Sequence, residues 1–162
     1  IRDRDKVNDH YLQINSDYIG CVDDTCLATG ELLPVKDTPF DFNKRKRIGQ
    51  DLEADHIQLK NAFGYDHSFV LNGTENQLTL EEPVSGRRLI ISTTAPVVQV
   101  YTGNFLKDGC IGKAGRVYEN REGVALETQL MPNAINTEEN PSTILRKGDK
   151  FESNTKYVFE IM

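Results

Sequence analysis

The sequence has no long hydrophobic run: no apolar stretch approaches the ~20 residues that a membrane-spanning helix needs. Its first residues, IRDRDKVNDH, are highly charged and contain no apolar segment of a secretory signal peptide. They also include no initiator methionine, so we expect the chain to start partway through a longer protein. These absences exclude a helical membrane anchor within the sequence, and we expect no membrane partner.

The sequence lacks both a zinc-binding cysteine motif and an extended basic stripe. Cys21, Cys26 and Cys110 are an odd number with spacings that match no zinc motif, so we expect reduced, structural thiols and a cytoplasmic location. The formal net charge is −6, and the basic run NKRKR (43–47) is followed by the acidic QDLEAD. We interpret that run as a solvated loop and expect no nucleic-acid partner.

Several catalytic motifs are absent as well. The sequence has no glycine-rich phosphate loop, no nucleophile elbow and no cluster of metal ligands, so we expect neither a metal nor another cofactor. The three histidines, His10, His56 and His67, each stand alone in the sequence, and we interpret all three as structural.

Most of what is present resembles short strands separated by turns, within a chain long enough for one domain with a real core. Residues 77–94 predict a hairpin turned at PVSG. Four further segments are predicted strands: 10–15, 97–102, 124–130 and 155–161. The helical spacing of Ile48, Leu52, His56 and Leu59 predicts one helix over residues 48–59. The pattern predicts an all-β fold, an antiparallel sandwich or barrel with one short helix.

Polar side chains interrupt two of these strands. Val98 and Val100 alternate with Gln99 and Tyr101, and Leu126 marks a core face that leaves Glu127 on the opposite face. The carboxylate of Glu127 points either into solvent or into a polar cavity, where desolvation would suit it to acid–base chemistry.

The stretch AFGYDHSFVL (62–71) poses the same alternative. Two ionisable residues, Asp66 and His67, stand beside the apolar Phe69, Val70 and Leu71. They form either a turn that caps a strand or a ligand-binding carboxylate at the edge of a pocket. Polar residues on sheet faces are compatible with recognition of a polyhydroxylated ligand.

Five segments in order carry a resemblance to the aldose 1-epimerases, the galactose mutarotases. They are TGELLPVKDTPFDF (29–42), GYDHSF (64–69), SGRRLIISTTAPVVQVYTGNFL (85–106), GVALETQLMPNAIN (123–136) and PSTILRKGDKFESNTKYVFE (141–160). The resemblance extends over nearly all of the chain. It implies a large antiparallel β-sandwich, of which residues 1–162 are the C-terminal portion.

The resemblance also implies an activity, the interconversion of α and β anomers of free aldoses such as galactose or glucose. It identifies Glu127 as the catalytic base that takes the C1 hydroxyl proton, and Asp66 as the carboxylate that binds sugar hydroxyls. Gln99 and Tyr101 are carried over as lining of the substrate pocket. Ring opening needs a second group that protonates the ring oxygen, but no metal or redox cofactor.

The sequence departs from the family pattern at that second group. The two upstream histidine motifs of the family are absent, and His10 and His67 do not match them. Smaller departures are Ser68, Arg121 and Thr137. We therefore expect the general acid to come from an N-terminal segment of the same protein, and this chain to be inactive and incompletely folded without it.

Three other interpretations remain open. The first is a non-catalytic carbohydrate-binding β-sandwich, which would have no need of Glu127. The second is a related protein acting on sugar phosphates, but Arg87 and Arg88 are adjacent in a strand and point to opposite faces. The third is a purely structural fragment.

Overall fold

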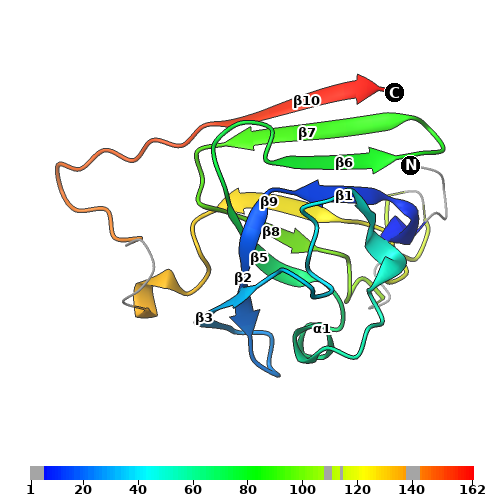
Figure 1. Cartoon of the computed structure of the whole chain (residues 1–162), viewed down its shortest axis with the longest axis horizontal. Helices are drawn as coiled ribbons and strands as arrows, with labels where there is room; N and C mark the ends of the chain where they lie inside the picture. Colours follow the sequence, from blue (N-terminus) through cyan, green and yellow to red (C-terminus); the bar gives the residue numbers. More distant parts are fainter. Residues whose placement is uncertain (1–5, 108–110, 114, 138–142) are drawn as a thin grey trace.

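Two antiparallel five-stranded sheets form the computed structural model, which describes residues 6–107, 111–113, 115–137 and 143–162. One sheet has the order β10 (Thr155–Ile161), β7 (Arg87–Thr93), β6 (Leu78–Glu82), β1 (Tyr11–Ile14) and β4 (Lys46–Arg47). The other has the order β3 (Ala28–Pro34), β2 (Ser16–Val22), β5 (Asp66–Leu71), β8 (Val97–Tyr101) and β9 (Ala125–Gln129) (Figure 1). The predicted all-β fold is confirmed.

A hydrophobic core fills the space between the two sheets. Alternate residues of each strand point into it, because successive side chains of a strand point to opposite faces. Burying each large apolar side chain contributes about 1.5–3 kcal/mol. Fully buried members come from both sheets and from the segments that cross between them: Leu12, Ile14, Ile19, Phe40, Phe42, Ile48, Tyr65, Phe69, Leu78, Ile91, Val98 and Val100.

The predicted hairpin is confirmed as β6 and β7, with Leu78 opposite Ile91 and Glu82 opposite Arg87. Its turn is held by the Glu82 carboxylate, which accepts hydrogen bonds from the backbone N–H groups of Val84 and Ser85. The four other predicted strands correspond to β1, β8, β9 and β10.

One short helix is present, as predicted, but the predicted span of residues 48–59 is wrong. A 3-10 helix (Ile48–Gln50) and a short helix α1 (Ile57–Asn61) are separated there by turns. Ile48 and Leu52 recur at helical spacing because the connecting loop buries both of them, not because they share a helix face. Asp51 departs from helical dihedrals and forms an ion pair with Lys46, and His56 caps α1 with its Nδ1 atom.

Three strands, β2, β3 and the two-residue β4, have no counterpart in the strand predictions. β2 contains an irregularity between Gly20 and Val22, and β3 is mostly exposed, so neither shows clean alternation. A tight turn joins them, in which the Asp23 carboxylate accepts hydrogen bonds from the backbone N–H groups of Thr25 and Leu27. Propensity and alternation are weak guides for such irregular or exposed strands.

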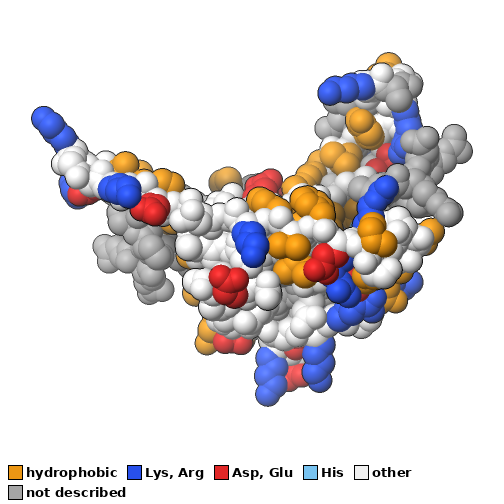
Figure 2. All heavy atoms as spheres, turned by 90° about the horizontal axis from the view of Figure 1, so that it is seen from above, with side chains coloured by type: hydrophobic (Ala, Val, Ile, Leu, Met, Phe, Trp, Pro, Cys, Tyr) orange, Lys and Arg blue, Asp and Glu red, His pale blue; other side chains and the backbone are white. Residues whose placement is uncertain are grey.

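The core-facing side of the first sheet is covered unevenly. Leu12 on β1, Leu80 on β6, Leu89 on β7 and Phe159 on β10 lie in one cross-strand row. Leu12 is 0% exposed, whereas Phe159 is 78% exposed. Ile161 and Tyr157 extend the bare surface along β10. Figure 2, which looks onto the molecule from above Figure 1, shows hydrophobic side chains in the hollow of its outline. The second sheet therefore leaves β10 uncovered.

None of the helices in the described part of the chain has the length and apolar character needed to cross a membrane.

Candidate functional site

Three neighbouring strands, β5, β8 and β9, bring the predicted site residues to one face. Phe69, Val98 and Leu126 point from these strands towards the core. Asp66, Gln99 and Glu127 differ from those three residues by odd numbers of positions along their strands, so they lie on the opposite face. The three predicted polar residues share the outer face of the sheet.

The strand register places Gln99 in the middle of this group. Gln99 is directly opposite Ser68 on β5 and opposite Glu127 on β9. Asp66 is opposite Tyr101, two positions further along β8 and on the same face. Opposed side chains in antiparallel strands have Cβ atoms about 4.5–5.5 Å apart, and diagonal neighbours about 7–8 Å apart. All four predicted site residues therefore lie within reach of one small ligand.

Hydrogen bonds fix the orientation of the Gln99 amide. Its Nε2 atom donates to Asp66 Oδ1 at 2.7 Å, and its Oε1 atom accepts from the Ser68 hydroxyl. The second Asp66 oxygen, Oδ2, has no hydrogen bond to any described residue, and it can accept one from a ligand hydroxyl. Burial raises the pKa of the Asp66 carboxyl above its usual value, and the bond from Gln99 partly offsets that rise.

His67 supports this arrangement from the core side. Its Nδ1 atom accepts a hydrogen bond from the backbone N–H of Asp66, and its Nε2 atom bonds to Gln58 Oε1 on α1. Burial lowers the pKa of His67 to about 3. The imidazole is therefore neutral at pH 7 and too weak a base to accept a proton there, which confirms the structural interpretation.

A cavity of about 350 Å³ lies above the polar face. Asp66, Gln99, Tyr101 and Glu127 all line it, with Glu127 the exposed member. The Tyr101 hydroxyl accepts a hydrogen bond from the backbone N–H of Phe105, which fixes the ring in the wall. Carboxylates, an amide and an aromatic ring together supply hydrogen bonds and an apolar surface, the combination that a sugar requires.

Three lining residues were not identified from the sequence: Phe105, Gln129 and Pro132. Gln129 could have been found, because it lies two positions beyond Glu127 on the same face of β9. Phe105 and Pro132 come from loops, where strand alternation gives no signal. Ser68 was noted only as a departure from the family pattern, yet it orients Gln99.

The basic residues considered for a sugar phosphate lie elsewhere. Arg87 and Arg88 are on β7, in the other sheet. The Arg88 guanidinium forms ion pairs with Glu81 and Glu160. No lysine, arginine or histidine is among the described residues that line the Asp66–Glu127 cavity. Nor do the described residues contain a group of three or more His, Cys, Asp or Glu placed to hold a metal ion.

Comparison with known proteins identifies the family of this β-sandwich. The family model for aldose 1-epimerase matches residues 1–158. The chain therefore belongs to the aldose 1-epimerase family, as its motifs indicated.

Relatives of known name agree with this assignment. The chain is 38% identical to galactose mutarotase of Homo sapiens over 158 residues, and 35% identical to aldose 1-epimerase of Haemophilus influenzae over 159 residues. These alignments cover 96% and 95% of this chain but 45% and 46% of the relatives. The chain thus spans about half the length of the curated relatives it matches.

Solved structures show the same fold. The GalM/aldose epimerase homologue from C. elegans matches with a TM-score of 0.88 and 30% identity, covering 99% of this chain and 48% of that structure. Galactose 1-epimerase from Lactobacillus acidophilus matches with a TM-score of 0.74 and 31% identity, covering 96% of this chain and 45% of that one.

Proposed function

We propose that the full-length protein interconverts the α and β anomers of a free aldose such as galactose or glucose. "Full-length" here means this chain together with an N-terminal segment, so that residues 1–162 form the C-terminal portion of one sandwich domain. The observation that carries the proposal is the alignment of Asp66, Gln99 and Glu127 across three adjacent strands in one cavity. The names of the relatives support it.

Each residue has a role in this chemistry. The Glu127 carboxylate removes the proton from the C1 hydroxyl, and an acid delivers a proton to the ring oxygen as the C1–O5 bond breaks. The open-chain carbonyl rotates, and the reverse steps close the ring on its other face. Asp66 and Gln99 hold sugar hydroxyls, and Tyr101 lines the wall. Glu127 is exposed and at the rim, where a C1 hydroxyl can reach it.

The acid is assigned to the N-terminal segment. The described residues lining the cavity include no histidine, so the residues at hand do not complete the acid–base pair. The bare apolar surface along β10 gives that segment a place to pack, because burial of Phe159 and Ile161 would be favourable. The relatives are about twice as long as the chain, which is room enough for such a segment.

The alternatives have less support. A non-catalytic sugar-binding sandwich would use Asp66 and Gln99 but gives Glu127 no function. A sugar-phosphate enzyme needs cations that converge on the phosphate, whereas Arg88 is paired with Glu81 and Glu160 in the other sheet. A purely structural fragment does not account for the oriented Gln99 amide.

Polarimetry of freshly dissolved α-galactose tests the proposal on the full-length protein. Glu127→Gln should lower kcat by about 10²–10⁴-fold, the usual contribution of a general base, with only a modest change in sugar binding. Glu31→Gln, which changes an exposed carboxylate on β3 of the same sheet, is the matched control and should leave the rate unchanged.

Three results would contradict the proposal. Full activity of Glu127→Gln would show that Glu127 is not the catalytic base, whereas a full-length protein that binds the sugar without interconverting its anomers would favour the binding-module interpretation. Substantial mutarotation by residues 1–162 alone would show that the acid does not come from an N-terminal segment.

A further inference from the structure

The peptide group between Tyr65 and Asp66 is held at both ends. Its carbonyl oxygen, on Tyr65, accepts hydrogen bonds from the backbone N–H of Thr102 and from the side-chain amide of Asn104, both at 3.1 Å. Its N–H, on Asp66, donates to Nδ1 of His67. The direction of the Asp66 side chain depends on the orientation of this peptide group, because the Cα–Cβ bond is fixed relative to the backbone. Residues that do not line the Asp66–Glu127 cavity therefore determine where the carboxylate points.

Asn104 is at the centre of this support, in the loop that follows β8, and it is buried. Its Nδ2 atom donates to the backbone oxygen of Ala62, at 2.6 Å, and to that of Tyr65. Its Oδ1 atom accepts from the Thr102 hydroxyl and from the Arg121 guanidinium. The amide thus uses both of its N–H groups and its oxygen within the protein. Turning the amide over would place Nδ2 against the guanidinium, so only one orientation satisfies every group.

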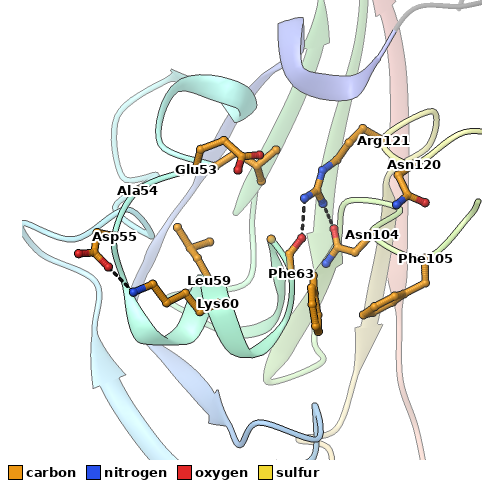
Figure 3. Close-up of a pocket in the computed structure, with 12 residues that line it drawn as sticks. Glu53, Ala54, Asp55, Leu59, Lys60, Phe63, Asn104, Phe105, Asn120 and Arg121 are labelled. Atoms are coloured by element: carbon orange, nitrogen blue, oxygen red, sulfur yellow. Dashed lines mark hydrogen bonds and ion pairs between the residues drawn. The ribbon is translucent and has the colours of Figure 1, made fainter.

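Arg121 ties Asn104 to the turn that precedes β5. Its Nη1 atom donates to Asn104 Oδ1, and its Nη2 atom donates to the backbone oxygen of Phe63. Figure 3 shows the guanidinium between these two residues, with a dashed line to each. Two acceptors on separate loops suit the planar fork of an arginine, which the single ammonium of a lysine lacks. Gly64 leaves room for the fork, because a Cβ at that position would collide with the guanidinium.

Charge pairing does not explain the position of Arg121. The acceptors that the structure describes for its side chain are all neutral oxygens, on Phe63, Thr102 and Asn104. Burial lowers the pKa of the guanidinium, and the carboxylate of Glu53 only partly offsets this effect. Withdrawing this charge from water is therefore unfavourable by itself. The contacts that accompany it hold the turn before β5 against the loop after β8, which is a geometric role.

We propose that Arg121 is a positioning residue for sugar binding, which acts through Asn104 to hold the Asp66 carboxylate in the orientation that accepts a sugar hydroxyl. This inference rests on the proposed function, in which Asp66 binds the sugar. Neither Arg121 nor Asn104 lines the Asp66–Glu127 cavity, so both act on the sugar only through the turn that leads into Asp66. Glu127 lies two strands away, on β9. Loss of the Arg121 contacts should therefore weaken sugar binding more than proton transfer.

Polarimetry of α-galactose with the full-length protein separates binding from turnover. Arg121→Met keeps an unbranched side chain but removes the hydrogen bonds, and it should raise KM by about five- to twentyfold while changing kcat by less than about threefold. Arg121→Lys keeps the charge without the fork and should give a smaller rise in KM. Glu122→Gln is the matched control, because it weakens the ion pair with Arg116 at the next position of the same loop. The control should leave KM unchanged.

A double-mutant cycle tests whether Arg121 acts through Asn104. Asn104→Ala alone should also raise KM, because the Ala62 and Tyr65 carbonyls lose their amide donor. In the double variant of Arg121→Met and Asn104→Ala, KM should rise by less than the product of the two single effects, since both residues support one turn. Independent, multiplying effects would contradict the assignment of one positioning unit.

Amide hydrogen exchange gives a measurement that does not depend on activity. The N–H groups of Gly64 and Asp66 are hydrogen-bonded next to the turn, to Leu59 and His67. In full-length Arg121→Met they should exchange about tenfold faster or more than in the wild type, whereas amides at the centres of β5 and β8 should change little.

Three outcomes would overturn the positioning role: an unchanged KM in Arg121→Met, a fall in kcat as large as the rise in KM, or faster exchange spread evenly over the sheet. The last two would mean that Arg121 only stabilises the fold. If the wild-type protein does not interconvert the anomers, the proposed function fails, and exchange at Asp66 still decides whether Arg121 holds that residue in place.

Discussion

Asp66 and His67 are neighbours on β5 but lie on opposite faces of one sheet, and burial shifts their pKa values in opposite directions. On the outer face the pKa of the Asp66 carboxyl is raised, and the side chain borders a cavity. On the inner face the pKa of His67 is lowered to about 3, and the ring is fully buried against Phe40. Burial favours the neutral form of both groups. Because successive side chains of a strand point to opposite faces, Asp66 borders the cavity while His67 supports it from the core.

The same division holds on the next two strands. Val98, Val100 and Leu126 belong to the core, whereas Gln99 and Glu127 face the cavity. The inner face supplies stability and the outer face supplies chemistry. Substitutions that differ by one position along a strand should therefore have different kinds of effect, and the predictions below test that separation.

The largest effect is expected on the inner face. Phe69→Ala in the full-length protein should lower the free energy of unfolding by about 3–5 kcal/mol, because it removes a fully buried ring from the core. Val70→Ala, one position along on the outer face, should cost about 1 kcal/mol, because Val70 is half-buried in a small cluster with Val97 and Met131. Urea titrations of both variants measure the difference. Similar losses for the two would contradict the division of faces.

Alternation explains why so much of this division could be predicted from the sequence. Leu126 on β9 was assigned to a core face, and it packs against the core. Val98 and Val100 alternate with Gln99 and Tyr101 in the sequence, and both are buried in the core. A strand that is half buried imposes a period of two, which sequence reveals directly. The outer-face positions of Gln99, Tyr101 and Glu127 follow from the same period.

Other features depend on contacts that no local pattern records. The helical spacing of Ile48 and Leu52 came from a loop folded onto the core, so the period was real but its cause was not a helix. Phe63 and Phe105 are brought together from segments 42 positions apart by Arg121, which the sequence marked only as a departure from its family. Contacts between a loop and the core, or between two loops, depend on the tertiary structure and leave no local pattern in the sequence.

A smaller effect is expected from the pH dependence of stability. The folded-state pKa of His67 is about 3, below the ~6.5 of an unperturbed histidine, so the unfolded state binds the proton more readily. His67 therefore contributes stability that is complete above about pH 6.5 and is lost as the pH falls towards 3, by up to about 1.4 kcal/mol per pH unit. The raised pKa of the Asp66 carboxyl has the opposite effect on stability: it favours the folded state at low pH, and this contribution is lost as the pH rises above the ~3.9 of an unperturbed aspartate.

Urea midpoints of the full-length protein between pH 4 and 7 measure this slope. His67→Asn removes the titrating group while keeping an oxygen near the Asp66 N–H, and it should flatten the slope in that range. The His67 ring proton signals should also stay constant between pH 5 and 8. A His67 signal that titrates near pH 6.5 would show that the ring is not held neutral by the core.

The smallest effect on stability is expected at the centre of the outer face. Gln99→Met keeps the side-chain length but removes the bond donated to Asp66 and the bond accepted from Ser68. The free energy of unfolding should fall by about 1 kcal/mol, the usual net value of such a contact. The pKa of the Asp66 carboxyl should rise further, because burial still favours its neutral form and the hydrogen bond that lowered the pKa is gone.

The Asp66 side-chain carboxyl carbon reports this change in an NMR pH titration of the full-length protein. Gln129→Met is the matched control, because Gln129 lines the same cavity but has no hydrogen bond to Asp66. It should leave the Asp66 titration where it is. An Asp66 pKa that falls in Gln99→Met, or that shifts equally in both variants, would mean that the amide does not hold the carboxylate. Asp66 and Gln99 would then have to be treated as two separate contacts to the sugar rather than as one preorganised pair.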